Sequence, residues 1–92
     1  MATVFAWDGS LWEVDRYSRE KISSRAGRFN SLLALGDIVL TDTTYTDTDL
    51  ATRTIFWRTY AGLARTFTVE EFLRFSIAVD EKLESVYENS LL

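Results

Sequence analysis

The spacing of apolar residues changes several times along the chain, and each change predicts a different element. Residues 3–14 contain two short runs rich in aromatic and β-branched residues, one on each side of Asp8-Gly9. Asp-Gly is a favoured dipeptide in two-residue hairpin turns, because glycine adopts positive φ without a steric penalty. This pattern predicts a β-hairpin over residues 3–14.

The next segment, residues 16–35, has the period of a helix. Its apolar side chains gather toward one side of a helical projection. They are Tyr17, Ile22, Phe29, Leu32, Leu33 and Leu35. Gly36 follows the last of them and is typical of a residue that ends a helix.

Residues 38–60 allow two interpretations. Ten of the eleven threonines lie between positions 41 and 68, and threonine and aromatic residues favour a pleated surface. The first interpretation therefore predicts strands at 38–45 and 52–60, joined by the polar residues 46–49. The second interpretation caps a helix at Asp49 and continues it to Arg65. Its apolar stripe would consist of Phe56, Tyr60, Leu63 and Phe67.

The last segment is predicted to be a helix over residues 69–88. Thr68 and Glu71 have the spacing of a capping box, in which each side chain binds a backbone N–H of the other. The apolar positions that follow recur at intervals of three and four. These positions are Phe72, Phe75, Val79, Leu83 and Val86.

These elements predict one α+β domain spanning residues 1–92. Its order is ββαββα, with two hairpins and two helices packed in two layers. The alternative, if residues 49–65 are helical, is a mostly α fold with an N-terminal hairpin.

Composition narrows the possible functions. The 92 residues include no histidine, cysteine or proline. General acid–base catalysis near neutral pH most often uses histidine, and thiol chemistry requires cysteine. The aspartates between positions 37 and 49 suit turns and helix caps better than a metal site. We therefore expect a protein that is not an enzyme and that binds no cofactor or metal.

Location is also an expectation from composition. No run approaches the ~20 apolar residues that cross a bilayer, and residues 1–14 lack a basic region typical of signal peptides. We expect no membrane partner and a location in the cytoplasm or in a virion.

Charge is unevenly distributed along this acidic chain, whose formal net charge is −4. Residues 16–28 carry five cations, which form the predicted anion-binding set. These are Arg16, Arg19, Lys21, Arg25 and Arg28. A low overall pI makes nucleic acid a weaker prediction than ion pairs with carboxylates of this chain or of a neighbouring copy.

Aromatic residues supply the predicted partner-binding set. The chain has three tryptophans, four tyrosines and six phenylalanines, and those in the predicted strands alternate between the two faces of a sheet. Tryptophan and tyrosine are frequent at interface hot spots. The predicted partner-binding residues are Trp7, Trp12, Tyr45, Trp57 and Tyr60.

Together these features predict a component of protein–protein assemblies, homo- or hetero-oligomeric, for example a structural protein of a virus or phage. One alternative is a small regulator that binds a host protein through an acidic helix face. That face would consist of Asp80, Glu81, Glu84 and Glu88. Another alternative is an anion or nucleic-acid binder that uses residues 16–28.

Overall fold

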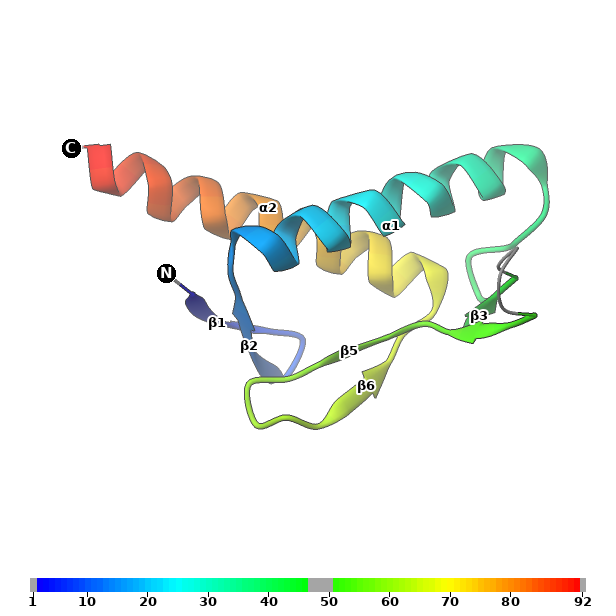
Figure 1. The fold of residues 1–92 in the computed structure, drawn as a ribbon, viewed down its shortest axis with the longest axis horizontal. Helices are drawn as coiled ribbons and strands as arrows, with labels where there is room; N and C mark the ends of the chain where they lie inside the picture. The colour runs from blue at the N-terminus through cyan, green and yellow to red at the C-terminus, as the bar shows by residue number, and fades with distance from the viewer. Residues whose placement is uncertain (1, 47–50, 92) are drawn as a thin grey trace.

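Two long helices lie on one side of the molecule, and three short antiparallel hairpins lie on the other (Figure 1). The structure is a computed structural model that describes residues 2–46 and 51–91, with the side chains of residues 86–91 excepted. The elements are β1 (Thr3–Trp7), β2 (Ser10–Val14), α1 (Arg16–Leu35), β3 (Thr44–Tyr45), β4 (Arg53–Thr54), β5 (Phe56–Arg58), β6 (Ala64–Thr66) and α2 (Val69–Leu91). The predicted α+β class is confirmed, and the predicted order ββαββα roughly matches the observed one.

The β1–β2 hairpin forms where the sequence predicts it. Asp8 and Gly9 have φ of 48° and 79°, which is the backbone of a two-residue turn matched to the twist of a hairpin. The register pairs Phe5 with Trp12 and Ala6 with Leu11. Alternation then divides the hairpin into an inner face that carries Phe5 and Trp12 and an outer face that is exposed to solvent.

Helix α1 begins and ends at the residues predicted. The Asp15 carboxylate caps it by accepting a hydrogen bond from the Ser18 N–H at 2.7 Å. At the other end, Gly36 takes φ of 79°, a left-handed conformation that lets its N–H and that of Asp37 bind the last carbonyls. Only the central part of the apolar stripe is buried, because Tyr17 and Leu35 at its two ends are exposed.

The segment between the helices differs from both interpretations of the sequence. It is not helical at residues 51–66, so the mostly α alternative is wrong. The predicted strand 38–45 is reduced to β3, and 52–60 is divided into β4 and β5. Strand β4 pairs with β3, whereas β5 pairs with β6, a strand the sequence analysis did not predict. The predicted connection 46–49 lies largely outside the described residues.

Ile55 is the point where the two small hairpins meet. It is fully buried between β4 and β5. Its N–H donates to the Thr43 carbonyl, and its carbonyl accepts from the Phe67 N–H, both at 2.9 Å. Because Ile55 bonds to segments on both sides, the apolar stretch 55–57 serves two hairpins rather than one long strand.

Helix α2 is held at its start by the predicted capping box. The Thr68 N–H donates to the Glu71 carboxylate at 3.0 Å, and the Glu71 N–H donates to the Thr68 hydroxyl at 3.1 Å. The N–H groups of Val69 and Glu70, which are in the first turn and have no acceptor within the helix, donate to carbonyls of the loop after α1. The first turn therefore satisfies its backbone donors, as a helix end must.

Aromatic rings from every layer meet in the core. The Trp12 ring lies 4.6 Å from Phe75 and 5.6 Å from Phe67, measured between ring centroids. Its indole N–H donates to the Trp7 carbonyl at 2.9 Å, so the ring is buried with its polar atom satisfied. Trp12 thus joins the first hairpin to α2.

Candidate functional site

The predicted partner-binding aromatics divide between the core and the surface. Trp12 is 0% exposed and Tyr45 is 5% exposed, so the placement of these two rings on a partner surface is corrected. Trp12 shares the inner face of the hairpin with Phe5. Tyr45 packs edge-on against Phe29 of α1, with ring centroids 5.2 Å apart. A domain this small uses its large rings to fill the core.

The other three predicted aromatics have surface area. Trp7 and Trp57 are half-buried and pack against the core, and Tyr60 is 55% exposed. The Arg65 guanidinium lies 5.6 Å from the centre of the Trp7 ring and also pairs with the Asp8 carboxylate. Of the five predicted residues, Tyr60 is thus the one that is mainly exposed.

Tyr60 belongs to an apolar surface that we call the hairpin surface. It consists of Val4, Leu11, Tyr60 and Leu63, which are 45%, 51%, 55% and 69% exposed. Val4 and Leu11 are diagonal neighbours on the outer face of β1–β2. The Tyr60 N–H donates to the Leu11 carbonyl at 2.8 Å, which fixes the β5–β6 turn against β2.

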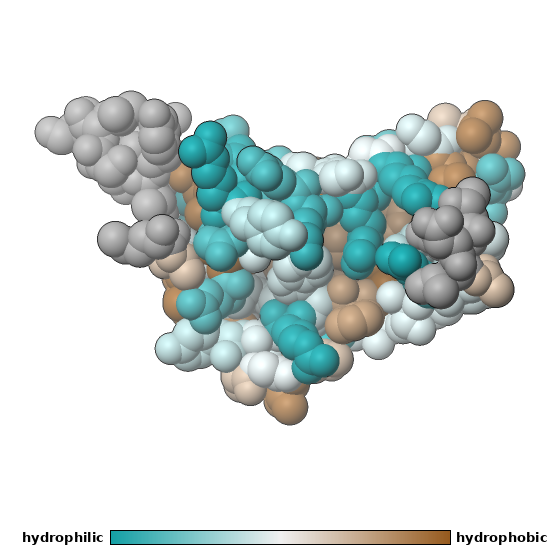
Figure 2. All heavy atoms as spheres, in the orientation of Figure 1, coloured by the Kyte–Doolittle hydropathy of each residue, from teal (hydrophilic) through white to brown (hydrophobic). Residues whose placement is uncertain are grey.

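Figure 2 shows hydrophobic atoms at the lower tip of the molecule, where Figure 1 places the turn between β5 and β6. The upper part of the same view, over α1, is mainly hydrophilic. Val4, Leu11 and Leu63 were not among the predicted partner-binding residues. The alternation of Val4 and Leu11 with Phe5 and Trp12 was a signal that Val4 and Leu11 lie on the outer face. Leu63 lies in the β5–β6 turn, which was not predicted because strand β6 was not predicted.

The five predicted anion-binding residues also divide. Arg19 is half-buried and pairs with Asp80 at 2.9 Å and with Glu84 at 3.5 Å, which links α1 to α2. Ion pairs with carboxylates of this chain or of a neighbouring copy were the expectation for these cations, and Arg19 forms such pairs within the chain. Two carboxylates of the predicted acidic face are consequently paired within the chain, and the Glu88 side chain lies outside the described residues.

Three of the remaining cations line one open groove between α1 and the β3–β4 hairpin. Its lining is Tyr17, Glu20, Lys21, Ser24, Arg25, Arg28, Tyr45 and Arg53. Arg53 lines this groove because strand β4 pairs it directly with Tyr45 of β3. No local pattern indicates that contact, and the sequence analysis missed it. Arg16 is exposed and does not line the groove.

Aromatic rings support the cations of this basic groove. The Arg25 guanidinium lies 5.8 Å from the Tyr45 ring centre and 5.9 Å from that of Phe72, and the Lys21 ammonium lies 4.5 Å from that of Tyr17. Such cation–π contacts hold the charged groups in place without neutralising them. The groove therefore offers positive charge beside Glu20, the carboxylate in its lining.

The fold and these surfaces define a small α+β domain with an apolar surface and a basic groove. In the part of the chain that the structure describes, no cluster of three or more potential metal ligands occurs. Over the same residues, neither helix is long and apolar enough to span a membrane. Comparison with protein-family models, with curated proteins and with solved structures finds no match to this chain.

Proposed function

We propose that this protein is a non-catalytic assembly component that associates with copies of itself through the hairpin surface. The observation that carries the proposal is the exposure of Leu11 and Tyr60 side by side, joined through a backbone hydrogen bond. Contiguous exposed apolar residues on a small domain mark contact sites for other proteins. The absence of histidine and cysteine from the sequence supports a role without catalysis.

The rigidity of this region supports the same proposal. The Arg65 side chain donates to the Asp8 carbonyl at 2.8 Å and pairs with the Asp8 carboxylate, which ties β6 to the turn of the first hairpin. A preorganised surface loses little conformational entropy on association. The apolar side chains of the hairpin surface are therefore presented on a fixed frame.

The mass of the purified full chain in solution tests this proposal. Light scattering coupled to size-exclusion chromatography should give a mass that rises with concentration above the 10.6 kDa of one chain. A mass that stays at 10.6 kDa over the whole accessible concentration range would contradict self-association.

The basic groove supports a second candidate function, the binding of a polyanion. Lys21, Arg25 and Arg28 lie on one face of α1, and Arg53 approaches from β4. Clustered cations bind phosphates by releasing counterions, so that affinity falls steeply with salt. Overall acidity limits this function to a local contact, because the rest of the domain repels a long polyanion.

We predict that Lys21→Glu weakens binding of a fluorescent single-stranded oligonucleotide severalfold, because the substitution reverses one charge in the groove. Fluorescence anisotropy at low and high salt measures the effect. Arg74→Glu is the control, since it also reverses one positive charge, on α2, outside the groove and outside the hollow beside β1. Equal affinities for the two variants, or binding insensitive to salt, would rule out the groove as a phosphate site.

A further inference from the structure

Strand β1 has an edge whose backbone groups point away from the hairpin. Opposite residues of an antiparallel pair alternate between those that exchange both backbone hydrogen bonds and those whose N–H and C=O face outward. The Leu11 carbonyl accepts from Tyr60, which lies outside the hairpin, so the Ala6–Leu11 pair is of the outward-facing kind. Alternation assigns the same geometry to Val4.

This edge is open in the described part of the chain. No hydrogen bond from outside the hairpin to the backbone of Val4 or Ala6 occurs among residues 2–46 and 51–91. Both residues are exposed. Natural edge strands are commonly protected by charged side chains or proline, and β1, with the sequence TVFAW, contains neither.

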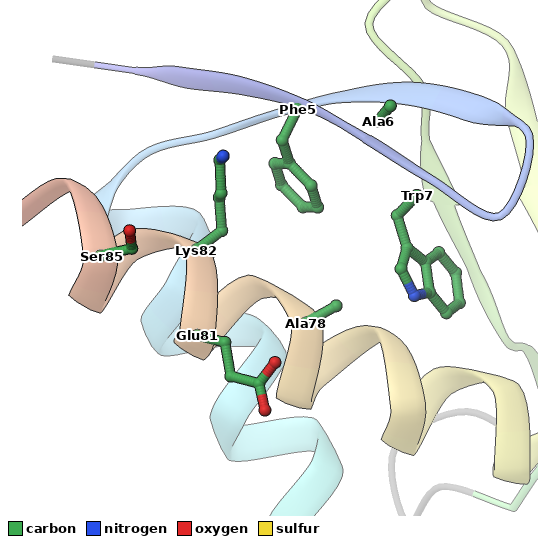
Figure 3. A pocket seen from close by; sticks show the side chains of 7 residues that line it. All are labelled: Phe5, Ala6, Trp7, Ala78, Glu81, Lys82 and Ser85. Atoms are coloured by element: carbon green, nitrogen blue, oxygen red, sulfur yellow. The ribbon is translucent and has the colours of Figure 1, made fainter.

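A hollow beside the edge lies between β1 and α2 (Figure 3). It is lined by Phe5, Ala6, Trp7, Ala78, Glu81, Lys82 and Ser85. The side chains of Phe5 and Trp7 point toward α2, and Ala6 points the other way. The last turns of α2 extend past the strand pair (Figure 1), so a strand added to β1 would lie beneath the helix.

We propose that a second copy of this chain adds its own β1 antiparallel to this edge and forms a continuous four-stranded sheet. The inference rests on the proposed self-assembly and adds to the hairpin surface a second contact, the edge of β1. The two-fold axis passes beside Phe5. Val4 of each copy then exchanges both backbone hydrogen bonds with Ala6 of the other.

Self-complementarity identifies the second copy as the occupant. Val4 and Ala6 are placed symmetrically about Phe5, so one two-fold axis satisfies all their outward donors and acceptors, as an isologous contact requires. Strand β1 brings no charge to the contact, so antiparallel alignment creates no repulsion between strands. The hollow carries one acidic and one basic residue, Glu81 and Lys82, so these two add no net charge to a contact between copies.

The arrangement also extends the hairpin surface. Val4 lies on the outer face of β1, and pairing through the edge places the outer faces of both hairpins in one sheet. Strand addition supplies direction and register, while the outer side chains supply apolar area. Edge pairing leaves Leu11, Tyr60 and Leu63 exposed, so the hairpin surface of each pair stays open to a further pair.

Ala6→Pro tests the pairing because it removes an outward N–H and leaves the bonds within the hairpin intact. Each dimer would lose two backbone hydrogen bonds, and we expect self-association to weaken roughly tenfold to a hundredfold. Sedimentation velocity measures the dissociation constant. Ala6→Ser keeps the N–H and should associate as the wild type does. Glu13→Pro, which removes an outward N–H from the opposite edge of the hairpin, should also associate normally.

Amide hydrogen exchange of the wild-type chain provides the second measurement, in case Ala6→Pro fails to fold. The Val4 and Ala6 amides should exchange more slowly as concentration rises. Assembly that persists unchanged in folded Ala6→Pro, or exchange at these amides that does not depend on concentration, would overturn the edge pairing and leave self-assembly standing. A monomeric wild type would instead reject the proposed function itself.

Discussion

Trp12 and Tyr60 are both aromatic residues next to a hairpin turn, yet their surroundings give them opposite roles. Trp12 shares a face with Phe5 and is enclosed by Phe67 and Phe75. Tyr60 lies in the turn between β5 and β6, where its ring has no second layer above it. At the residue scale, a ring is therefore a core residue or a contact residue according to the layer that faces it.

We predict that Trp12→Ala lowers the free energy of unfolding by about 3–5 kcal/mol, because it leaves a cavity at the centre of the aromatic cluster. That is a large part of the ~5–15 kcal/mol typical of a folded domain. Tyr60→Ala should change the same quantity by less than about 0.5 kcal/mol. Urea unfolding followed by circular dichroism measures both, and equal losses for the two variants would contradict this division of roles.

The start of α2 and the end of α1 were predictable because their signals, the Thr68–Glu71 pair and Gly36, act on backbone groups within a few residues. Asp15 caps α1 in the same local way, although it was not used in the prediction, and α2 continues to Leu91, beyond the predicted residue 88. The strands after α1 were not predictable in the same way. Ile55 bonds to Thr43 on one side and Phe67 on the other, and such distant contacts decide where a short strand begins.

The partners of the charged side chains also depend on contacts between distant parts of the chain. Arg19 pairs with Asp80, which is 61 residues later in the chain. A basic run on a helix therefore predicts a cationic face, but not which cations remain available. Arg53 reached the basic groove only through the pairing of β3 with β4.

At the element scale, the cap of α1 gives the protein a specific dependence on acid. The hydrogen bond from the Ser18 N–H to the Asp15 carboxylate lowers the pKa of Asp15 below its ordinary value. The folded state therefore holds this proton less tightly than the unfolded state. The resulting stabilisation is fully present above about pH 5 and is lost as the pH falls through the folded-state pKa.

We predict that Asp15→Asn, which keeps a capping oxygen but cannot ionise, is less sensitive to acid than the wild type. Urea unfolding between pH 2 and 7, both limits being approximate, provides the comparison. Glu13→Gln removes a neighbouring carboxylate that does not cap the helix, and it should retain the acid dependence of the wild type. An unchanged pH profile in Asp15→Asn would show that the cap does not contribute it.

At the scale of the whole molecule, the basic groove and the hairpin surface lie on different elements. The basic groove follows α1, and the hairpin surface lies on β1–β2 and the β5–β6 turn. Leu35 provides a useful contrast, because it is exposed at the far end of α1, away from the hairpin surface. We propose the hairpin surface for self-association, and not exposed apolar residues in general.

The most direct test is the concentration-dependent mass of Leu11→Lys compared with Leu35→Lys, measured by light scattering. Both substitutions place the same charge on an exposed leucine, so neither should unfold the domain. We expect Leu11→Lys to form no species larger than the edge-paired dimer under conditions where the wild type does, and Leu35→Lys to associate as the wild type does. Association beyond the dimer that survives in Leu11→Lys, or that is lost equally in both variants, would contradict the hairpin surface as a site of assembly.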